Sequence, residues 1–360
     1  MNPAELDYDL PQELIAQRPL AERDASRMLL LSRSSGAWDD RQFRELPDLL
    51  NGNELIVLNN ARVLPARLLG HRQGIRATEA GAQHPAPGEL LRAPIEVLLV
   101  RQLSPDTWET LVRPGRKVLS GERIIFGEGE LEARVEGRGD YGLRTLRFSS
   151  KNGFLETLHR LGHIPLPPYL KRADEPLDRE RYQTVFAKKG VAVAAPTAGL
   201  HFTPGILERL RARQIEIAEI TLEVGLGTFQ PVRTEHIEDH KIHSESYEVS
   251  DPAAAAIERA RHDNRPILAV GTTVVRALED AAEKASGRVG PGQAEATIFL
   301  YPGKPFRVVS ELLTNFHLPQ STLLAMVSAF AGQESVLRAY RHAVEAKYRF
   351  YSYGDCMLIR

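Results

Sequence analysis

Two hydrophobic patterns alternate along the second half of the chain. Short runs of aliphatic and β-branched residues, typical of buried strands, occupy residues 191–195, 215–225, 266–271 and 296–302. Apolar residues at helical spacing occupy residues 204–210, 253–260, 272–283, 321–332 and 334–345. This alternation of strands and helices predicts a three-layer α/β domain.

The first 66 residues extend the same pattern. They predict a short helix, a strand at residues 28–31 and a second strand at residues 55–58. Asn59, Asn60 and Arg62 follow the second strand. Asparagine at a strand end commonly binds local backbone. Because α/β proteins also build ligand sites where strands end, a ligand-facing role stays open for these three residues.

From about residue 66 the pattern changes. Short alternating runs at residues 95–103, 107–114, 122–137 and 141–149 are separated by Gly, Pro and Asp turns, which indicates an antiparallel sheet or a small barrel. Residues 73–90 have no periodicity and predict a loop. The predicted fold is α/β: a three-layer α/β catalytic domain of residues 1–66 plus 151–360, with an inserted antiparallel β-barrel-like domain of residues 67–150.

The turn between the strand at 191–195 and the next helix is the first candidate site. Thr203 is a good N-cap and Pro204 suits the first helical position. A strand, a small-residue loop and a capped helix place backbone N–H groups and the positive helix end together, which favours polar or anionic ligand groups. Taken alone, such a unit is more often an ordinary strand-to-helix turn, an interpretation that His201 and Phe202 between Gly199 and the cap weaken.

Four loops that combine small and polar residues follow predicted strands, at residues 196–202, 223–230, 271–273 and 314–319. Four such loops in one domain predict a ligand cleft at the strand ends. The candidate cleft residues are Thr197, Gly199, His201, Phe202, Glu223, Gly225, Gly227, Thr228, Gly271, Thr272, Thr273 and Asn315. The two glycines of Gly-Leu-Gly at 225–227 do not make a dinucleotide fingerprint, because the third glycine is missing.

Residues 235–248 concentrate histidine and carboxylate side chains. His236 and His240 would share one face of a helix, which suggests a metal site. His240 and His243 beside Asp239 serve equally well as a general acid–base group. A polar solvated turn is the third possibility for this segment.

The overall charge of the chain does not indicate nucleic-acid binding. Lys and Arg number 46 against 47 Asp and Glu, so any nucleic-acid binding requires a local patch. Tyr169, Lys171, Arg172, Arg181 and Tyr182 interleave aromatic rings with cations, as single-stranded RNA recognition does. Interspersed carboxylates leave a salt-bridged surface loop as the alternative.

The cysteine content and the hydropathy of the chain bear on its cellular compartment. The single cysteine, Cys356, excludes an intrachain disulfide framework and a multi-cysteine zinc site. The first residues lack the order of a signal peptide, and no apolar run reaches the length of a membrane span. These features predict a cytoplasmic protein.

Six segments together resemble one family, the S-adenosylmethionine:tRNA ribosyltransferase-isomerases of queuosine biosynthesis. They are AAPTAGLHF, EVGLGTFQPV, IEDHKIHSE, AVGTTVVRALE, TNFHLPQSTL and YRFYSYGDCMLI. The resemblance implies an α/β domain with an inserted β-barrel. It also implies transfer and isomerisation of the ribosyl moiety of S-adenosylmethionine onto 7-aminomethyl-7-deazaguanine at the tRNA wobble position. The products are epoxyqueuosine, adenine and methionine.

The chemistry of this family requires a base, a group near the leaving adenine and an RNA surface. We expect His243 or His240 as the base, Asp239 as its orienting partner, and His317 or His201 near the adenine. We expect the anticodon stem-loop to bind a surface that includes Arg62, and a monomer that uses S-adenosylmethionine as cosubstrate without a metal. Two departures from the family pattern are Glu223, where a histidine is expected, and the extra length at 73–90.

Two other functions compete with this one. An S-adenosylmethionine-dependent RNA methyltransferase would use the same cleft but give a methylated product and S-adenosylhomocysteine. A non-catalytic RNA-binding module built on the β-rich insert would bind an RNA hairpin, and S-adenosylmethionine would cause no thermal shift.

Overall fold

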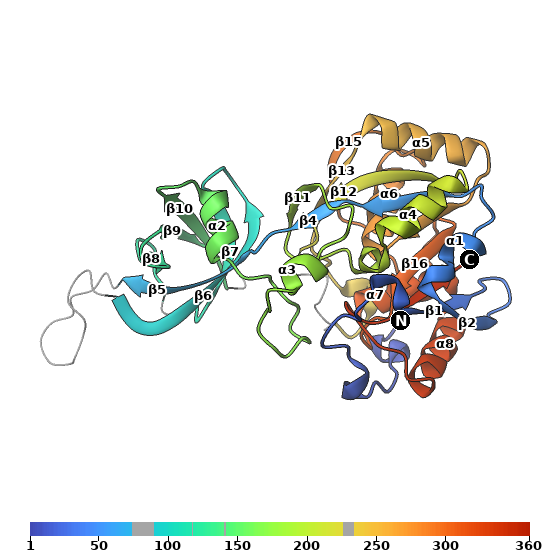
Figure 1. Ribbon diagram of the computed structural model, residues 1–360, viewed down its shortest axis with the longest axis horizontal. Helices are drawn as coiled ribbons and strands as arrows, with labels where there is room; N and C mark the ends of the chain where they lie inside the picture. Colours follow the sequence, from blue (N-terminus) through green and yellow to red (C-terminus); the bar gives the residue numbers. More distant parts are fainter. Residues whose placement is uncertain (74–89, 117, 140–141, 226–233) are drawn as a thin grey trace, which may run out of the picture. The chain divides into compact units, whose positions relative to one another are not determined.

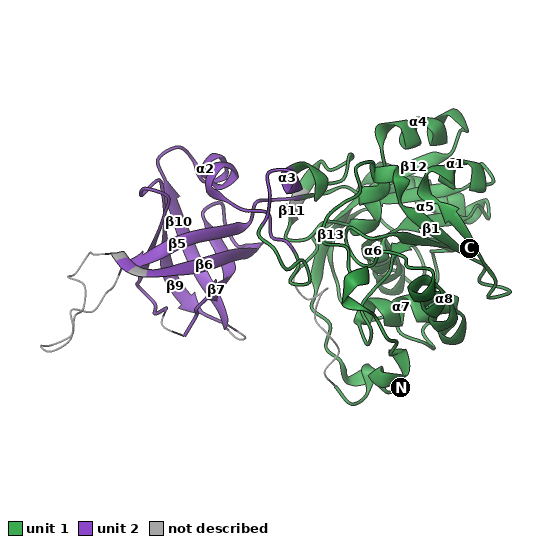
Figure 2. Ribbon diagram, turned by 60° about the horizontal axis from the view of Figure 1, so that its bottom comes forward, with its two compact units in different colours: residues 1–62, 167–173, 180–360 green, residues 63–166, 174–179 purple. Residues whose placement is uncertain are grey.

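The structure is a computed structural model that describes residues 1–73, 90–116, 118–139, 142–225 and 234–360. Most of the predicted loop at 73–90, together with Gly227 and Thr228 of the predicted cleft, lies outside the described residues. The chain forms two compact units (Figure 2). Unit 1 comprises Met1–Arg62, Pro167–Ala173 and Glu180–Arg360, and unit 2 comprises Val63–Leu166 and Asp174–Arg179.

Unit 1 is built on a nine-stranded sheet with the strand order β15-β13-β12-β3-β14-β16-β17-β1-β2 (Figure 1). Its centre is parallel, because β3 pairs in parallel with β12 and β14, and β14 pairs in parallel with β16. The carboxyl ends of these four strands therefore meet at one edge of the sheet. The strands are β1 (Arg27–Leu31), β2 (Trp38–Gln42), β3 (Leu55–Asn59), β12 (Glu216–Leu222), β13 (Glu245–Val249), β14 (Ile267–Val270), β15 (Gly292–Ala296), β16 (Glu311–Asn315) and β17 (Cys356–Ile359).

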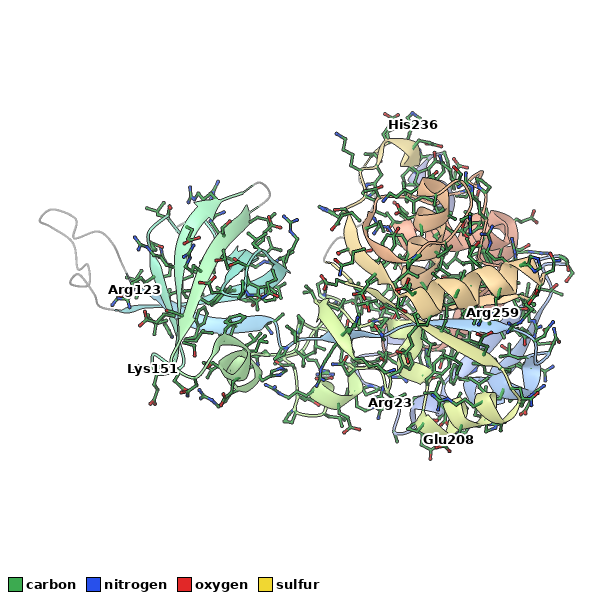
Figure 3. All side chains as sticks on the ribbon, turned by 90° about the horizontal axis from the view of Figure 1, so that it is seen from above. Arg23, Arg123, Lys151, Glu208, His236 and Arg259 are labelled. Atoms are coloured by element: carbon green, nitrogen blue, oxygen red, sulfur yellow. The ribbon has the colours of Figure 1, made fainter. Side chains whose placement is uncertain are left out.

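Helices cover both faces of this sheet. Successive side chains of a strand point to opposite faces, and in β3 Leu55 and Val57 join one buried cluster while Ile56 and Leu58 join the other. The first cluster contains α5 (Asp251–His262), α6 (Thr272–Lys284), α7 (Thr322–Ala331) and α8 (Gln333–Glu345). The second contains α1 (Leu46–Leu49) and α4 (Pro204–Ala212). The outward faces of α4 and α5 carry charged side chains, for example Glu208 and Arg259 (Figure 3).

Unit 2 contains a closed antiparallel barrel with the order β10-β7-β6-β5-β8-β9. Alternate residues point inward, and Trp108, Phe126 and Phe148 are among the buried ones. The strands are β5 (Arg67–Gln73), β6 (Leu90–Gln102), β7 (Thr107–Arg113), β8 (Arg123–Phe126), β9 (Leu131–Arg138) and β10 (Leu143–Ser150), followed by α2 (Phe154–Leu161). Further elements are the two-stranded sheet of β4 (Ala61–Val63) and β11 (Lys189–Ala192), and the short helix α3 (Asp178–Arg181). The predicted α/β class with an inserted β-barrel is confirmed.

Two predictions of local structure have different outcomes. The cap of α4 is confirmed, because Pro204 begins the helix and the Thr203 hydroxyl accepts from the Ile206 N–H at 3.2 Å. The strand predicted at 296–302 is wrong, because β15 ends at Ala296. The next two N–H groups, of Thr297 and Ile298, donate to the Asp280 carboxylate at 2.8 and 3.1 Å and so leave the sheet ladder.

Candidate active site

A cavity lies at the carboxyl ends of the central strands in unit 1. It encloses about 680 Å³ of space, part of it open to solvent. All four predicted loops contribute to its lining, through residues 195–198, Val224, residues 271–273 and residues 314–318. Of the predicted residues, it brings together Thr197, Gly271, Thr272, Thr273, Asn315, His317 and Tyr169. Gly271 has a φ of +94°, a conformation that glycine adopts without strain, and this lets β14 turn directly into α6.

Asn315 is the last residue of β16, and neighbouring backbone carbonyls fix the orientation of its side-chain amide. Its Nδ2 faces the backbone carbonyls of Tyr351 at 3.0 Å and Asp355 at 3.4 Å. A carbonyl only accepts hydrogen bonds, so the group that faces these two oxygens is the NH₂. Nδ2 also lies 3.3 Å from Nε2 of His201.

His201 supports Asn315 from the buried side. Because Asn315 donates to Nε2, the ring proton is on Nδ1, which lies 2.8 Å from the Ser26 hydroxyl. Burial lowers the pKa of His201 to about 4, so the ring is neutral near pH 7. His201 faces a small cleft with Arg23 and Arg181, and among the described residues this cleft shares only Ser352 with the main cavity. His201 therefore orients Asn315 from this neighbouring cleft.

His317 lines the main cavity and is also neutral. Its Nε2 lies 2.8 Å from the Thr314 hydroxyl, and burial lowers its pKa to about 3. Its backbone is held from two sides. The N–H donates to the Tyr340 hydroxyl at 3.1 Å, and the carbonyl accepts from the Tyr8 hydroxyl at 2.5 Å. A neutral, fixed imidazole provides hydrogen bonds but carries no imidazolium proton, so it does not act as a general acid near pH 7.

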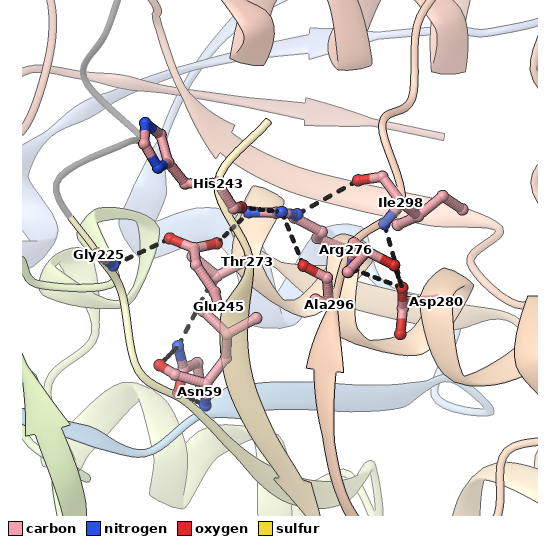
Figure 4. Close-up of polar contacts among 11 residues, drawn as sticks. Asn59, Gly225, His243, Glu245, Thr273, Arg276, Asp280, Ala296 and Ile298 are labelled. Carbon is pink, nitrogen blue, oxygen red and sulfur yellow. Dashed lines mark hydrogen bonds and ion pairs between the residues drawn. The ribbon is translucent and has the colours of Figure 1, made fainter. Parts of the chain in front are cut away.

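A second cavity adjoins the first and shares Thr272, Thr273 and Leu323 with it. A buried ion pair lies in its wall, because Nη1 of Arg276 on α6 lies 2.5 Å from the Glu245 carboxylate (Figure 4). Both side chains are less than one-tenth exposed. The other carboxylate oxygen accepts from the Gly225 N–H at 3.0 Å.

The Arg276 guanidinium also binds three backbone carbonyls around this cavity. It donates to the carbonyls of His243, Ala296 and Ile298, as Figure 4 shows. Through Glu245 it also fixes Gly225, the last described residue before the gap at 226–233. The pair therefore positions the wall of the second cavity.

The predicted acid–base residues lie near the second cavity. His243 lines it, and its ring is turned away from Arg276 (Figure 4). His240 is half-buried 5.7 Å from the Phe299 ring, and burial and the charge of His243 lower its pKa. Asp239 is exposed at the end of a single 3₁₀ turn rather than on the helix that a shared His236–His240 face requires. In the described ranges no group of three His, Cys, Asp or Glu is placed to hold a metal.

Four predicted cleft residues have other surroundings. Gly199 serves packing, since a Cβ there would lie 2.8 Å from the side chains of Phe186 and Thr184. Phe202 is fully buried against Phe43 and Phe186. Glu223 follows β12, and its N–H donates to the Ser246 carbonyl at 2.9 Å. Gly225 contacts Glu245, as described above.

The predicted RNA-contacting residues divide into surface and core. Arg62 and Lys171 are exposed, and Arg172 is half-buried and donates to the Gln17 carbonyl at 2.9 Å. Arg181 donates to the Ala21 carbonyl at 2.9 Å. Tyr182 is a correction to the predicted set. Its ring is fully buried and packs edge-on against Tyr353, so no base reaches it.

Sequence reasoning missed the segment that precedes the last strand. Tyr351 and Ser352 line the main cavity, and the Ser352 hydroxyl lies 2.5 Å from that of Tyr169. The segment belongs to YRFYSYGDC, which contributed to the family resemblance but follows no predicted strand. The signal available was its density of aromatic residues. The Glu245–Arg276 pair was also missed, because nothing in the local pattern marks a contact across 31 residues.

The fold and the cavity define a class of protein: an α/β protein with an inserted β-barrel and a cavity at the carboxyl ends of its strands, the place where α/β proteins bind small molecules. The chain matches the family model described as queuosine biosynthesis protein over residues 4–359. The chain belongs to this family, and the resemblance inferred from its motifs is confirmed. Among the described helices, none is both long enough and apolar enough to span a bilayer.

Named relatives match over the full chain. A protein of Solibacter usitatus (strain Ellin6076), named S-adenosylmethionine:tRNA ribosyltransferase-isomerase, is 54% identical, with 100% of both chains covered. A protein of Symbiobacterium thermophilum with the same name is 51% identical over 100% of both chains. A crystal structure of S-adenosylmethionine tRNA ribosyltransferase from Thermotoga maritima matches with a TM-score of 0.53 and 34% identity, covering 99% of this chain and 100% of that one.

Proposed function

We propose that this protein is an S-adenosylmethionine:tRNA ribosyltransferase-isomerase. It transfers and isomerises the ribosyl moiety of S-adenosylmethionine onto 7-aminomethyl-7-deazaguanine at the tRNA wobble position, giving epoxyqueuosine and releasing adenine and methionine. The observation that carries this proposal is the full-length identity of 54% to a relative with that name. The cavity at the strand ends supports it, and the relatives' name favours ribosyl transfer over methyl transfer.

The main cavity binds S-adenosylmethionine in this proposal. The N-terminus of α6, at Gly271–Thr273, lies in its lining and carries no side-chain cap within the described part of the chain. Free N–H groups and the positive helix end favour an anionic group such as the carboxylate of the methionyl moiety. Aromatic rings of Tyr169 and Tyr351 in the same lining offer surfaces for a purine.

The chemistry requires one proton to leave the ribose 5′ carbon, which the neighbouring sulfonium acidifies. His243 or His240 takes this proton: His243 lines the adjoining cavity, and burial and the charge of His243 lower the pKa of His240, which favours its neutral, proton-accepting form. Asp239 remains the proposed orienting partner. We assign His317 the role of a neutral hydrogen-bonding group near the adenine, because its pKa of about 3 means that it carries no imidazolium proton to transfer near pH 7.

The RNA surface comprises Arg62, Lys171, Arg172 and Arg181, with Tyr169 at its boundary with the cavity. All five belong to unit 1. The wobble base is splayed out of the anticodon loop, so that its aminomethyl group reaches the ribosyl donor. We further propose that the protein works in the cytoplasm as a monomer, without a metal, and that its α/β catalytic domain carries residues 67–150 as an insert.

The test is a reaction with purified protein, S-adenosylmethionine and an anticodon stem-loop that carries the aminomethyl-deazaguanine. Release of free adenine that requires both substrates supports the proposal. A methylated RNA with S-adenosylhomocysteine supports the methyltransferase alternative instead. RNA binding without any thermal shift by S-adenosylmethionine supports a non-catalytic module. A stem-loop with guanine at the wobble position is the matched control, because it lacks the attacking amine.

A further inference from the structure

Two residues that line the main cavity carry a buried polar atom without a hydrogen-bond partner among the described residues. They are Asn315, through Oδ1, and Tyr351, through its hydroxyl. The residues are 2% and 4% exposed. Nearly all buried polar atoms in folded proteins have a partner, so two exceptions in one cavity wall require an explanation.

The two atoms have opposite hydrogen-bonding character. The carbonyls of Tyr351 and Asp355 fix the Asn315 amide with Nδ2 toward them, which leaves Oδ1 as a pure acceptor. Burial raises the pKa of Tyr351 well above its usual range, so its hydroxyl keeps its proton and can donate. The residues that line the cavity therefore include one unpartnered acceptor and one unpartnered donor.

The backbone at Tyr351 is strained, and backbone hydrogen bonds hold Tyr351 and Asn315 in place. Tyr351 has a φ of +69°, a conformation that bulky residues rarely adopt. Its N–H donates to the Phe316 carbonyl at 3.2 Å and its carbonyl accepts from Asn315, so the two residues are locked to each other. Backbone strain of this kind clusters at ligand-binding sites.

We infer that Asn315 Oδ1 and the Tyr351 hydroxyl recognise the adenine edge of the cosubstrate. Asn315 accepts from the exocyclic amine, and Tyr351 donates to the neighbouring ring nitrogen. The Tyr351 ring, with its centroid 4.6 Å from that of Tyr169, supplies apolar surface in the same lining. The inference rests on the proposed function, because it takes S-adenosylmethionine as the ligand.

The pair predicts a specific discrimination. In the 6-oxo analogue, S-inosylmethionine, the edge is reversed: an oxygen replaces the amine and the ring nitrogen carries a hydrogen. The acceptor Asn315 Oδ1 then faces the 6-oxo oxygen, and the Tyr351 hydroxyl hydrogen faces the N–H of the ring. Wild-type protein should bind S-adenosylmethionine about 10- to 100-fold more tightly than the 6-oxo analogue, because a mismatched site leaves buried polar groups unpaired.

The experiment is titration calorimetry of both ligands with wild-type protein and the variants Tyr351→Phe and Asn315→Ala. Tyr351→Phe removes only the hydroxyl, so it preserves the packing, and thermal melting checks that each variant is folded. Tyr301→Phe is the matched control, because Tyr301 lies outside the linings of both cavities in the described residues. We expect Tyr351→Phe to weaken S-adenosylmethionine binding about 5- to 10-fold while binding of the 6-oxo analogue is unchanged.

An unchanged preference in folded Tyr351→Phe overturns the inference, whatever Asn315→Ala does. An analogue without the α-amino group is a third ligand. If the variants change the preference for that amino group instead of the 6-amino group, the assignment to adenine is also overturned. If wild-type protein binds no S-adenosylmethionine, both the proposed function and this inference are wrong. If it binds S-adenosylmethionine and the 6-oxo analogue equally tightly, only this inference is wrong.

Discussion

Replacing Arg276 with methionine tests the buried ion pair that builds the wall of the second cavity. Methionine is of similar length and fills the space, but it removes the cation beside Glu245. The Glu245 carboxylate is then held in a site that is only about 4% exposed. Breaking a buried pair by removing one partner costs about 3–5 kcal/mol, because it leaves an uncompensated buried charge. We expect Arg276→Met to lose free energy of unfolding in that range.

The double variant Glu245→Leu with Arg276→Met should recover part of this loss, because it removes the uncompensated buried charge. The carbonyls of His243, Ala296 and Ile298 and the Gly225 N–H lose these partners, so we expect the double variant to be more stable than Arg276→Met but less stable than wild type. The pair also holds Gly225 and the carbonyl of His243. The double variant should therefore remain folded and still release adenine slowly, because the cavity wall has lost its positioning contacts.

The assay is urea unfolding followed by circular dichroism, with adenine release as the functional readout. Arg259→Met is the matched control, because Arg259 on α5 forms an exposed pair with Glu216 and should cost less than about 1 kcal/mol. If Arg276→Met is as stable as Arg259→Met, the pair has no role in stability. If the double variant has wild-type activity, the positioning role is refuted.

Three further predictions concern other parts of unit 1. Burial and the Glu54 carboxylate raise the pKa of Glu311 from 4.5 to about 7, against the opposing effect of Arg360. Because the carboxyl pKa is raised in the folded state, the stability that protonated Glu311 contributes is complete below about pH 4.5 and is lost as the pH rises through 7. The variant Glu311→Gln should therefore have a free energy of unfolding about 2 kcal/mol higher than wild type at pH 8, and its stability should depend less on pH; urea unfolding measures both. Gly199→Val should lower stability by about 1–3 kcal/mol through its contacts with Phe186 and Thr184, whereas Gly205→Ala, whose Cβ meets only Thr203 at 3.9 Å, should not; equal melting temperatures would contradict the packing argument. Replacing Lys171 and Arg172 with Ala should weaken stem-loop binding and flatten its salt dependence without changing S-adenosylmethionine affinity, and unchanged salt dependence would place the RNA surface elsewhere.

Local signals predicted the elements well, because they report contacts between residues close in sequence. The Thr203–Pro204 cap is one example, and the period-two patterns of the barrel strands are another. The strand predicted at 296–302 was wrong because Asp280, on α6, takes the backbone N–H groups that a strand requires. A competitor 17 residues away leaves no trace in the hydrophobic pattern.

In the candidate site, too, local features were predictable and contacts between distant residues were not. Loops at the ends of parallel strands meet because of the topology, so Thr197, Gly271 and Asn315 were predictable from the order of strands and helices. The direction of each side chain was not. Phe202 and Tyr182 point into the core, and the protonation states of His201 and His317 depend on burial that only the packed structure provides. Tyr351 was missed because its part in the cavity depends on a contact with Asn315, 36 residues away.

The most direct test of the proposed function is the mass of the modified nucleoside after reaction with S-adenosylmethionine and the aminomethyl-deazaguanine stem-loop. Mass spectrometry of the digested RNA distinguishes the possible transfers, because a ribosyl-derived unit and a methyl group add different masses. The account predicts a nucleoside with the mass of epoxyqueuosine, formed in step with one equivalent of free adenine. A nucleoside of unchanged mass, or one that has gained only a methyl group, would contradict it.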